Sequence, residues 1–97
     1  MRTMVRVTIP VEAGNAAIKD GSLPKILAES MDKLRPEAAY FLTDGQGRRH
    51  MMLVIDLQSP ADVPRVAEPF FMGLNAGVEL SPCMNADDLR KGLSSSS

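Results

Sequence analysis

Three charged residues fall at positions where a strand alternates polar and apolar side chains: Arg6, Asp56 and Glu79. A guanidinium carries five N–H donors, so one arginine can bridge two carboxylates. Alternation places all three side chains on the same face of a sheet, and we expect Arg6 to lie between the two acids. The trio would then form either an ion network at an interface, which we favour, or a charged site that holds a polar ligand.

Three further side chains are candidates for binding or catalysis. His50 is the single histidine, and an unperturbed imidazole titrates near neutral pH, so it could act as an acid or base or contact a ligand. Tyr40 is the single tyrosine and could orient a ligand or donate a proton. Glu68 lies in an apolar helical segment and could line a pocket. The alternatives are structural: an interface or strand-end position for His50, packing for Tyr40, and a solvated or capping position for Glu68.

The short motifs of common enzyme classes are missing. The sequence contains no GxGxxG, P-loop, GxSxG, HExxH or CxxC motif. One histidine and one cysteine, Cys83, exclude a multi-histidine or multi-cysteine metal site within one chain. We therefore expect no metal and no cofactor, with a haem or a quinone as a weaker alternative. Cys83 carries no sequence mark of activation and is interpreted as a packed residue.

Composition limits the partners. The chain has 97 residues, a net charge of −1 and 44% hydrophobic residues, which is typical of one small globular domain. It lacks the basic face that nucleic-acid binding requires and the apolar run of about 20 residues that spans a membrane. Its beginning lacks the features of a signal peptide, so we expect a cytoplasmic protein. Residues 1–93 form the predicted domain, and residues 94–97 a loose serine tail.

A hairpin over residues 37–57 organises the predicted fold. Asp44-Gly45-Gln46-Gly47 predicts its turn, because Asp and Gly tolerate the positive φ that tight turns require. The second strand sorts its side chains by parity into an apolar row and a mixed row. The apolar row is Met51, Leu53, Ile55 and Leu57, and the mixed row is His50, Met52, Val54 and Asp56. Both faces of the strand are therefore expected to be covered, by different structures.

Strands are also predicted over residues 3–9 and 78–83. Helices are predicted over residues 14–19, 22–35, 62–74 and 85–92, with Ser22 as an N-cap and a kink or broken turn at Pro69. The order β-α-β-β-α-β is that of a ferredoxin-like α+β fold, followed by a short C-terminal helix. Right-handed crossovers place the strands in the order 2-3-1-4, with both crossover helices on one face of the antiparallel sheet.

The other face of this sheet would carry Met4, Arg6, Thr8, Met52, Val54, Asp56 and Glu79. This face is too apolar to remain in water. Homodimers are the commonest oligomers, and burial against a second copy is the simplest way to cover it.

Several segments together resemble the dimeric α/β-barrel superfamily: MVRVTIP, DxxxxAEPFF, VELSPCM and NADDL. The resemblance covers residues 1–93 and points to small bacterial proteins of that superfamily. It implies that two open sheets pair face to face, often with a ligand pocket in each subunit. Some members of such families are monooxygenases, isomerases or haem-handling enzymes.

Two functions remain open at this point. The first is a homodimeric module that binds a small organic molecule or assembles with a partner and has no catalysis of its own. The second is a small cofactor-independent enzyme, similar to a monooxygenase or an isomerase. Its pocket would be lined by Tyr40, His50, Phe70, Phe71 and methionines.

Overall fold

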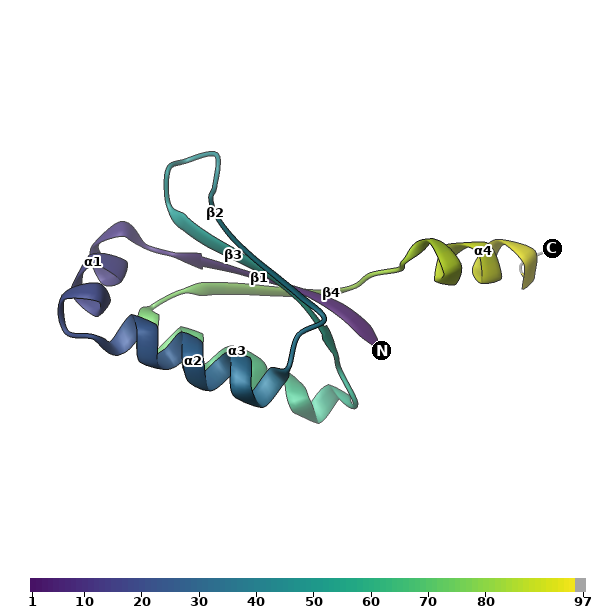
Figure 1. Ribbon diagram of the computed structural model, residues 1–97, viewed down its shortest axis with the longest axis horizontal. Helices are drawn as coiled ribbons and strands as arrows, with labels where there is room; N and C mark the ends of the chain where they lie inside the picture. Colours follow the sequence, from purple (N-terminus) through teal and green to yellow (C-terminus); the bar gives the residue numbers. More distant parts are fainter. Residues whose placement is uncertain (96–97) are drawn as a thin grey trace.

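The computed structural model describes residues 1–95 and shows an α+β domain with three helices on one face of a four-stranded antiparallel sheet (Figure 1). The elements in chain order are β1 (Arg2–Ile9), α1 (Val11–Lys19), α2 (Ser22–Leu34), β2 (Ala38–Thr43), β3 (Arg49–Asp56), the 3-10 turn η1 (Pro60–Asp62), α3 (Val63–Leu74), β4 (Gly77–Pro82) and α4 (Ala86–Ser95). The strand order is β2-β3-β1-β4, so the ferredoxin-like arrangement expected from the sequence is confirmed.

The core lies between the sheet and the helices, and strand parity determines its composition. Alternate residues of the two central strands point toward the helices and are buried: Val5, Val7 and Ile9 of β1, and Met51, Leu53 and Ile55 of β3. The helix α3 contributes Val66, Phe70 and Leu74 to the same core. Fully burying one such side chain contributes about 1.5–3 kcal/mol. The predicted apolar row of β3 is therefore confirmed as the helix-covered row.

The hairpin turn between β2 and β3 is organised by one carboxylate. Asp44 accepts hydrogen bonds at its Oδ1 atom from the backbone N–H groups of Gln46 and Arg48, both at 2.9 Å. The residue with positive φ in this turn is Gly47, at +76°, and neither Asp44 nor Gly45 has a positive φ. The turn is therefore located where the sequence predicts it, but the positive φ that favours glycine occurs at Gly47 rather than at Asp44 or Gly45.

The first crossover contains two helices. α1 begins at Val11, three residues before the expected start, and a turn at Asp20 and Gly21 separates it from α2. Ser22 was expected to cap α2, but the N-cap is Gly21 in the left-handed conformation, and Ser22 is the first helical residue. The Ser22 N–H donates instead to Asp20 Oδ1 at 2.8 Å.

The second crossover begins with a capping box. Ser59 Oγ accepts from the Ala61 N–H at 3.0 Å, and Asp62 Oδ2 accepts from the Ser59 N–H at 3.2 Å. α3 then starts directly after Asp62, as the sequence predicts. A kink or a broken turn was expected at Pro69, and the helix is continuous across this residue, so the broken turn is not present.

The last helix departs from the compact body. α4 projects beyond the end of the sheet, away from α1, α2 and α3 (Figure 1). The radius of gyration is 15.1 Å, whereas a compact domain of 100 residues has about 13 Å. α4 extends to Ser95 rather than ending at Gly92, so part of the serine segment expected to be loose is helical, and residues 96–97 lie outside the described residues. No helix within residues 1–95 has the length and apolar character needed to cross a membrane.

Candidate functional site

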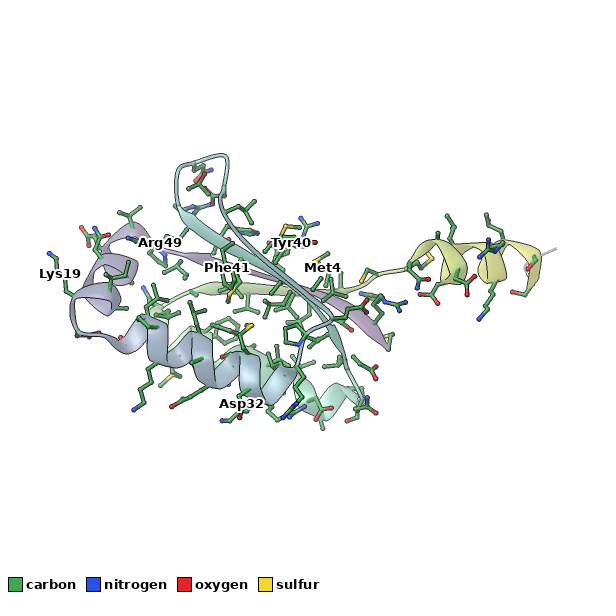
Figure 2. All side chains as sticks on the ribbon, viewed as in Figure 1. Met4, Lys19, Asp32, Tyr40, Phe41 and Arg49 are labelled. Atoms are coloured by element: carbon green, nitrogen blue, oxygen red, sulfur yellow. The ribbon has the colours of Figure 1, made fainter. Side chains whose placement is uncertain are left out.

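The face of the sheet opposite α1, α2 and α3 is termed the open face. Strand register arranges it in three rows of four residues, each row crossing the sheet from β2 to β4. The rows are Ala38, Val54, Met4 and Ser81; Tyr40, Met52, Arg6 and Glu79; and Leu42, His50, Thr8 and Gly77. Figure 2 labels Tyr40 and Met4 on this face. Four of the six candidate site residues predicted from the sequence, Arg6, Tyr40, His50 and Glu79, are in these rows.

The central row combines an aromatic ring, a thioether and two opposite charges. Arg6 lies directly opposite Glu79 across the β1–β4 pair, and both side chains are exposed. Residues directly opposite on one face have Cβ atoms about 4.5–5.5 Å apart, close enough for opposite charges to attract. The predicted proximity of Arg6 and Glu79 is therefore confirmed by the register.

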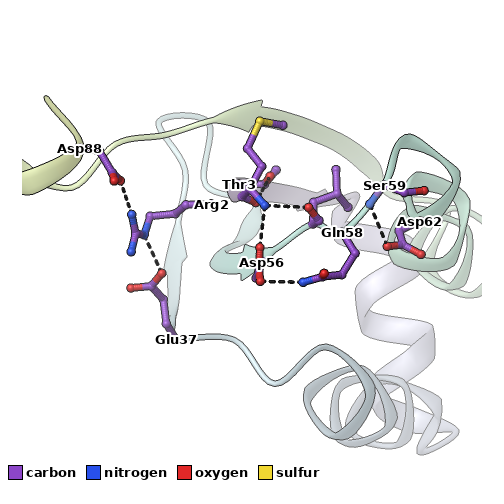
Figure 3. A network of polar contacts seen from close by, with 10 residues as sticks. Arg2, Thr3, Glu37, Asp56, Gln58, Ser59, Asp62 and Asp88 are labelled. Carbon is purple, nitrogen blue, oxygen red and sulfur yellow. Dashed lines mark hydrogen bonds and ion pairs between the residues drawn. The ribbon is translucent and has the colours of Figure 1, made fainter. Parts of the chain in front are cut away.

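Asp56, the third member of the expected ion network, lies elsewhere. It is opposite Arg2, four residues along β1 from Arg6, which is about 13 Å in an extended strand. Its carboxylate accepts a hydrogen bond from the Met1 ammonium at 2.6 Å and another from Gln58 Nε2 at 2.6 Å (Figure 3). The expectation that Arg6 lies between two acids is therefore wrong for Asp56. The hydrogen bond from the chain's ammonium holds the pKa of Asp56 below its ordinary value.

A polar cluster at this end of the sheet was not expected from the sequence. Arg2 donates from Nε to Glu37 Oε1 at 2.7 Å, and its Nη1 atom bonds to Asp88 of α4 (Figure 3). The hydrogen bond to Glu37 raises the pKa of Arg2 above its ordinary value. The cluster joins β1, the residue before β2, and α4. The one sequence signal for this cluster was that Arg2 has the same strand parity as Arg6. Its partners Glu37 and Asp88 come from distant segments, which alternation along β1 does not identify.

His50 sits at the β3 end of the third row. Its Nδ1 atom lies 2.9 Å from Thr8 Oγ1, and the two residues are opposite each other across β1 and β3. The hydroxyl thus holds one ring nitrogen and orients the imidazole on the open face. The half-buried imidazole ring lies opposite the apolar side chain of Leu42 across the β2–β3 pair.

The expected pocket of Tyr40, His50, Phe70 and Phe71 is not assembled. Tyr40 and His50 belong to the open face, whereas Phe70 is fully buried in the core beneath α3. The sheet lies between the two pairs of residues. Glu68 is exposed on α3, on the helical side of the sheet, so it is also separated from the open-face residues.

Two apolar grooves are present. One of ≈ 260 Å³ is lined mainly by Met1, Leu57, Pro60, Val63, Leu80 and Pro82. Another of ≈ 150 Å³ lies beside β2, with Leu23, Leu27, Phe41 and Met51 in its wall, and its lining extends to Leu42, Arg49 and the predicted site residue His50. Both present almost entirely apolar surface, and neither gathers several charged groups.

Cys83 is half-buried just after β4, and its N–H donates to the Arg2 carbonyl at 3.1 Å. Within the described part of the chain, no three histidine, cysteine or acidic side chains come together as potential metal ligands.

Comparisons with protein-family models, curated proteins and solved structures give no match. The open face is therefore identified as the candidate site from its geometry alone. It offers a broad apolar surface, one cation beside one anion, a phenol and an oriented imidazole. Such a surface suits contact with another protein surface or with an organic molecule that carries a polar group.

Proposed function

We propose that this protein is a homodimeric binding or assembly module, without catalysis of its own, in which the open faces of two copies pack together. The observation that carries the proposal is the difference between the two faces of one sheet. On the central strand β3 the helical-face residues Met51 and Leu53 are buried, whereas the open-face residues Met52 and Val54 of the same strand remain partly exposed. Monomers rarely leave a broad apolar patch in water, and such patches commonly mark interaction sites.

The charges of the open face support a second copy as the partner. In a twofold dimer the same patch must face itself, so a patch of one sign would repel its copy. Arg6 and Glu79 give the central row one charge of each sign. Two such rows can meet with opposite charges together, and the flanking apolar rows can interdigitate as in packed sheets.

Two paired sheets would also enclose the polar groups of the open face. The Tyr40 hydroxyl, the His50 imidazole and the Arg6 guanidinium would then face a space with apolar walls. This arrangement suits a small organic ligand that has an apolar body and a polar or anionic group. It is the arrangement that the resemblance to dimeric α/β barrels implies.

The hydrogen bond between Thr8 and His50 favours one alternative, a small cofactor-independent enzyme. An imidazole held in one orientation on an apolar face has the geometry of a general acid or base. The phenol of Tyr40 would be a second proton donor in such a site. His50→Gln would abolish turnover in the enzyme, whereas in a module it would change ligand affinity alone.

The dimer is tested by sedimentation equilibrium between about 1 and about 100 µM, which covers weak to moderate affinities. A mass of twice 10.5 kDa is expected in the upper part of this range. Met52→Lys places a charge at the centre of the open face and should raise the dissociation constant about tenfold or more.

Met72→Lys is the matched control, because Met72 is an exposed methionine on α3, outside the open face. It should leave the dissociation constant within about twofold of the wild-type value. A wild-type protein that remains monomeric throughout the concentration series would overturn the proposal, as would equal effects of the two substitutions.

A further inference from the structure

β2 is an edge strand, so within residues 1–95 only one of its two sides has a neighbouring strand. At the hairpin end of the β2–β3 pair, the Asp44 N–H donates to the Arg48 carbonyl at 2.9 Å. Along an antiparallel pair, residues that bond to the neighbouring strand alternate with residues whose main chain points away from it. Counting back from Asp44 in steps of two, the intervening residues direct their N–H and C=O groups away from β3. These residues are Ala39, Phe41 and Thr43, and they are termed the free edge.

Large apolar side chains are exposed on both faces of β2. Tyr40 and Leu42 on the open face are 68% and 43% exposed, and Phe41 is 59% exposed (Figure 2). Phe41 lies opposite the buried Met51, which places its ring on the helical side of the sheet. Natural proteins commonly protect an exposed edge strand with charged residues or proline. No residue of β2 is charged and none is proline, so the strand carries neither protection.

The opposite edge strand, β4, carries both protections. Glu79 places a charge in the middle of the strand, and Pro82 ends it with a residue that has no N–H to donate. A strand with these residues resists pairing with another chain. Of the two edges of this sheet, β2 is therefore the one suited to accept a further strand.

The apolar groove beside β2 has room for a side chain from such a strand. Its volume is ≈ 150 Å³, and Leu23 and Leu27 of α2 form its wall together with Phe41. A cavity of about 150 Å³ with leucine, isoleucine and phenylalanine walls can hold a benzene ring. The size of the groove therefore matches one aromatic side chain, placed on the helical side of a strand beside β2.

A second copy of β2 has the main-chain and side-chain features that this edge requires. A twofold axis perpendicular to the sheet pairs the two strands antiparallel, with Phe41 opposite Phe41 of the second copy. Ala39 and Thr43 lie two residues to either side, so each meets the other in the second copy. Every N–H of the free edge then finds a carbonyl, and the second phenylalanine ring lies at the groove. Because β2 has no charge, it meets its own copy without repulsion.

We propose that the free edge of β2 is a self-association site, at which two copies join strand to strand and their two four-stranded sheets become continuous. The contact lies at the side of the sheet and leaves the open face accessible. It therefore goes beyond the homodimer proposed above and does not depend on it.

The size of the contact determines its strength. β2 has 6 residues, whereas stable interfaces use about 20–30 residues on each side. An interface of this size is typical of weak association, and we expect a dissociation constant of about 0.1–1 mM. The open-face homodimer should form at lower concentration, because its three rows supply more residues on each side.

The first test measures the average mass by sedimentation equilibrium between about 0.1 and about 2 mM. The mass of the wild-type protein should rise above twice 10.5 kDa in this range. Phe41→Lys places a charge on the free edge, away from the open face, and should raise the dissociation constant of this step about tenfold or more. Met72→Lys, at an exposed methionine of α3, should leave it within about twofold. Circular dichroism verifies that each variant retains its fold.

The outcomes separate the two associations. Met52→Lys should weaken only the step in the micromolar range, and Phe41→Lys only the step near 1 mM, as about these concentrations are set by interface size. A wild-type mass that never exceeds that of the homodimer overturns the edge contact alone, as do equal effects of Phe41→Lys and Met72→Lys. A single millimolar step that is sensitive to Phe41→Lys and insensitive to Met52→Lys overturns the open-face homodimer alone.

The second test follows the main chain by amide hydrogen exchange at about 0.05 and about 1 mM protein. The amides of Ala39, Phe41 and Thr43 should exchange about twofold more slowly or more at the higher concentration. The amide of Leu42, which points to β3, is the control and should change less. Exchange at the free edge that is independent of concentration overturns the proposal. If it is slow at both concentrations, another segment of the same chain covers the edge instead.

Discussion

Arg2 on the first strand bonds to Asp88 on the last helix, 86 residues later in the chain. The same guanidinium donates to Glu37, so one side chain joins the start of β1, the entry to β2 and the start of α4. Arg2 therefore determines where the projecting helix begins.

Loss of the Arg2 head group should loosen α4 and leave the core intact. Arg2→Met retains the apolar stem of the side chain but removes both hydrogen bonds. In a monomeric sample, amide hydrogens of residues 86–95 should then exchange about tenfold faster or more, since local opening sets their protection. Arg6→Met is the control, because Arg6 lies on the open face and not beside α4. Equal acceleration in the two variants would contradict the anchoring role of Arg2.

Asp44 should stabilise the hairpin turn in a pH-dependent way. Hydrogen bonds from the backbone N–H of Arg48, above all, hold the pKa of Asp44 below its ordinary value. Because the folded-state pKa is the lower one, the contribution is present above the unfolded-state pKa of about 3.9 and is lost as the pH falls through the folded-state value.

Asp44→Asn should thus lower the midpoint of thermal unfolding at pH 7, and its difference from the wild type should shrink below about pH 3.9. Asp32→Asn, on the exposed side of α2, serves as the control and should show little effect. A deficit of Asp44→Asn that stays constant down to pH 2 would show that the carboxylate charge is irrelevant to the turn.

Two adjacent phenylalanines should differ sharply in their contribution to stability. Phe70 of α3 is fully buried in the core, and Phe70→Ala should lower the free energy of unfolding by about 3–5 kcal/mol through lost burial and a cavity. Phe71 is 42% exposed, and Phe71→Ala should cost less than about 1.5 kcal/mol. Urea denaturation at matched protein concentration measures both values. A larger loss of stability from Phe71→Ala than from Phe70→Ala would contradict the assignment of Phe70, and not Phe71, to the core-facing side of α3.

The central row of the open face should behave as a charge pair at the dimer interface. Arg6→Glu and Glu79→Arg each leave two like charges opposite each other, and each should raise the dimer dissociation constant about tenfold or more. The double exchange restores one charge of each sign and should recover most of the affinity. The coupling energy from this cycle, measured by sedimentation equilibrium, should exceed about 0.5 kcal/mol. Additive effects would mean that the two side chains do not share a contact.

The overall fold could be predicted because its signals are local. Alternation with period two separated Met51, Leu53 and Ile55 from Met52 and Val54, and both rows lie on the predicted faces. The boundaries of β1, α3 and the hairpin follow from proline, glycine and capping residues that act within a few positions. The order of elements then left few allowed topologies, since crossovers are right-handed.

The site could be predicted only in part, because parity assigns a face but not a register. Arg6 and Asp56 share the open-face parity, yet four residues of offset between β1 and β3 place Asp56 beside Met1 instead. That offset depends on the length of the crossover and on how the helices pack. Neither of these can be read from alternation.

By itself, the sequence determined the faces of the strands and the helical segments, because each depends on neighbours within a turn or two of chain. It also determined the sheet order, because the order of elements and right-handed crossovers leave few topologies. The tertiary structure decided which residues meet across the sheet, that Phe70 and Tyr40 lie on opposite sides of it, and that α4 leaves the body. These outcomes depend on contacts between distant segments such as Arg2 and Asp88. They are determined only when the whole chain has folded and each strand has found its register.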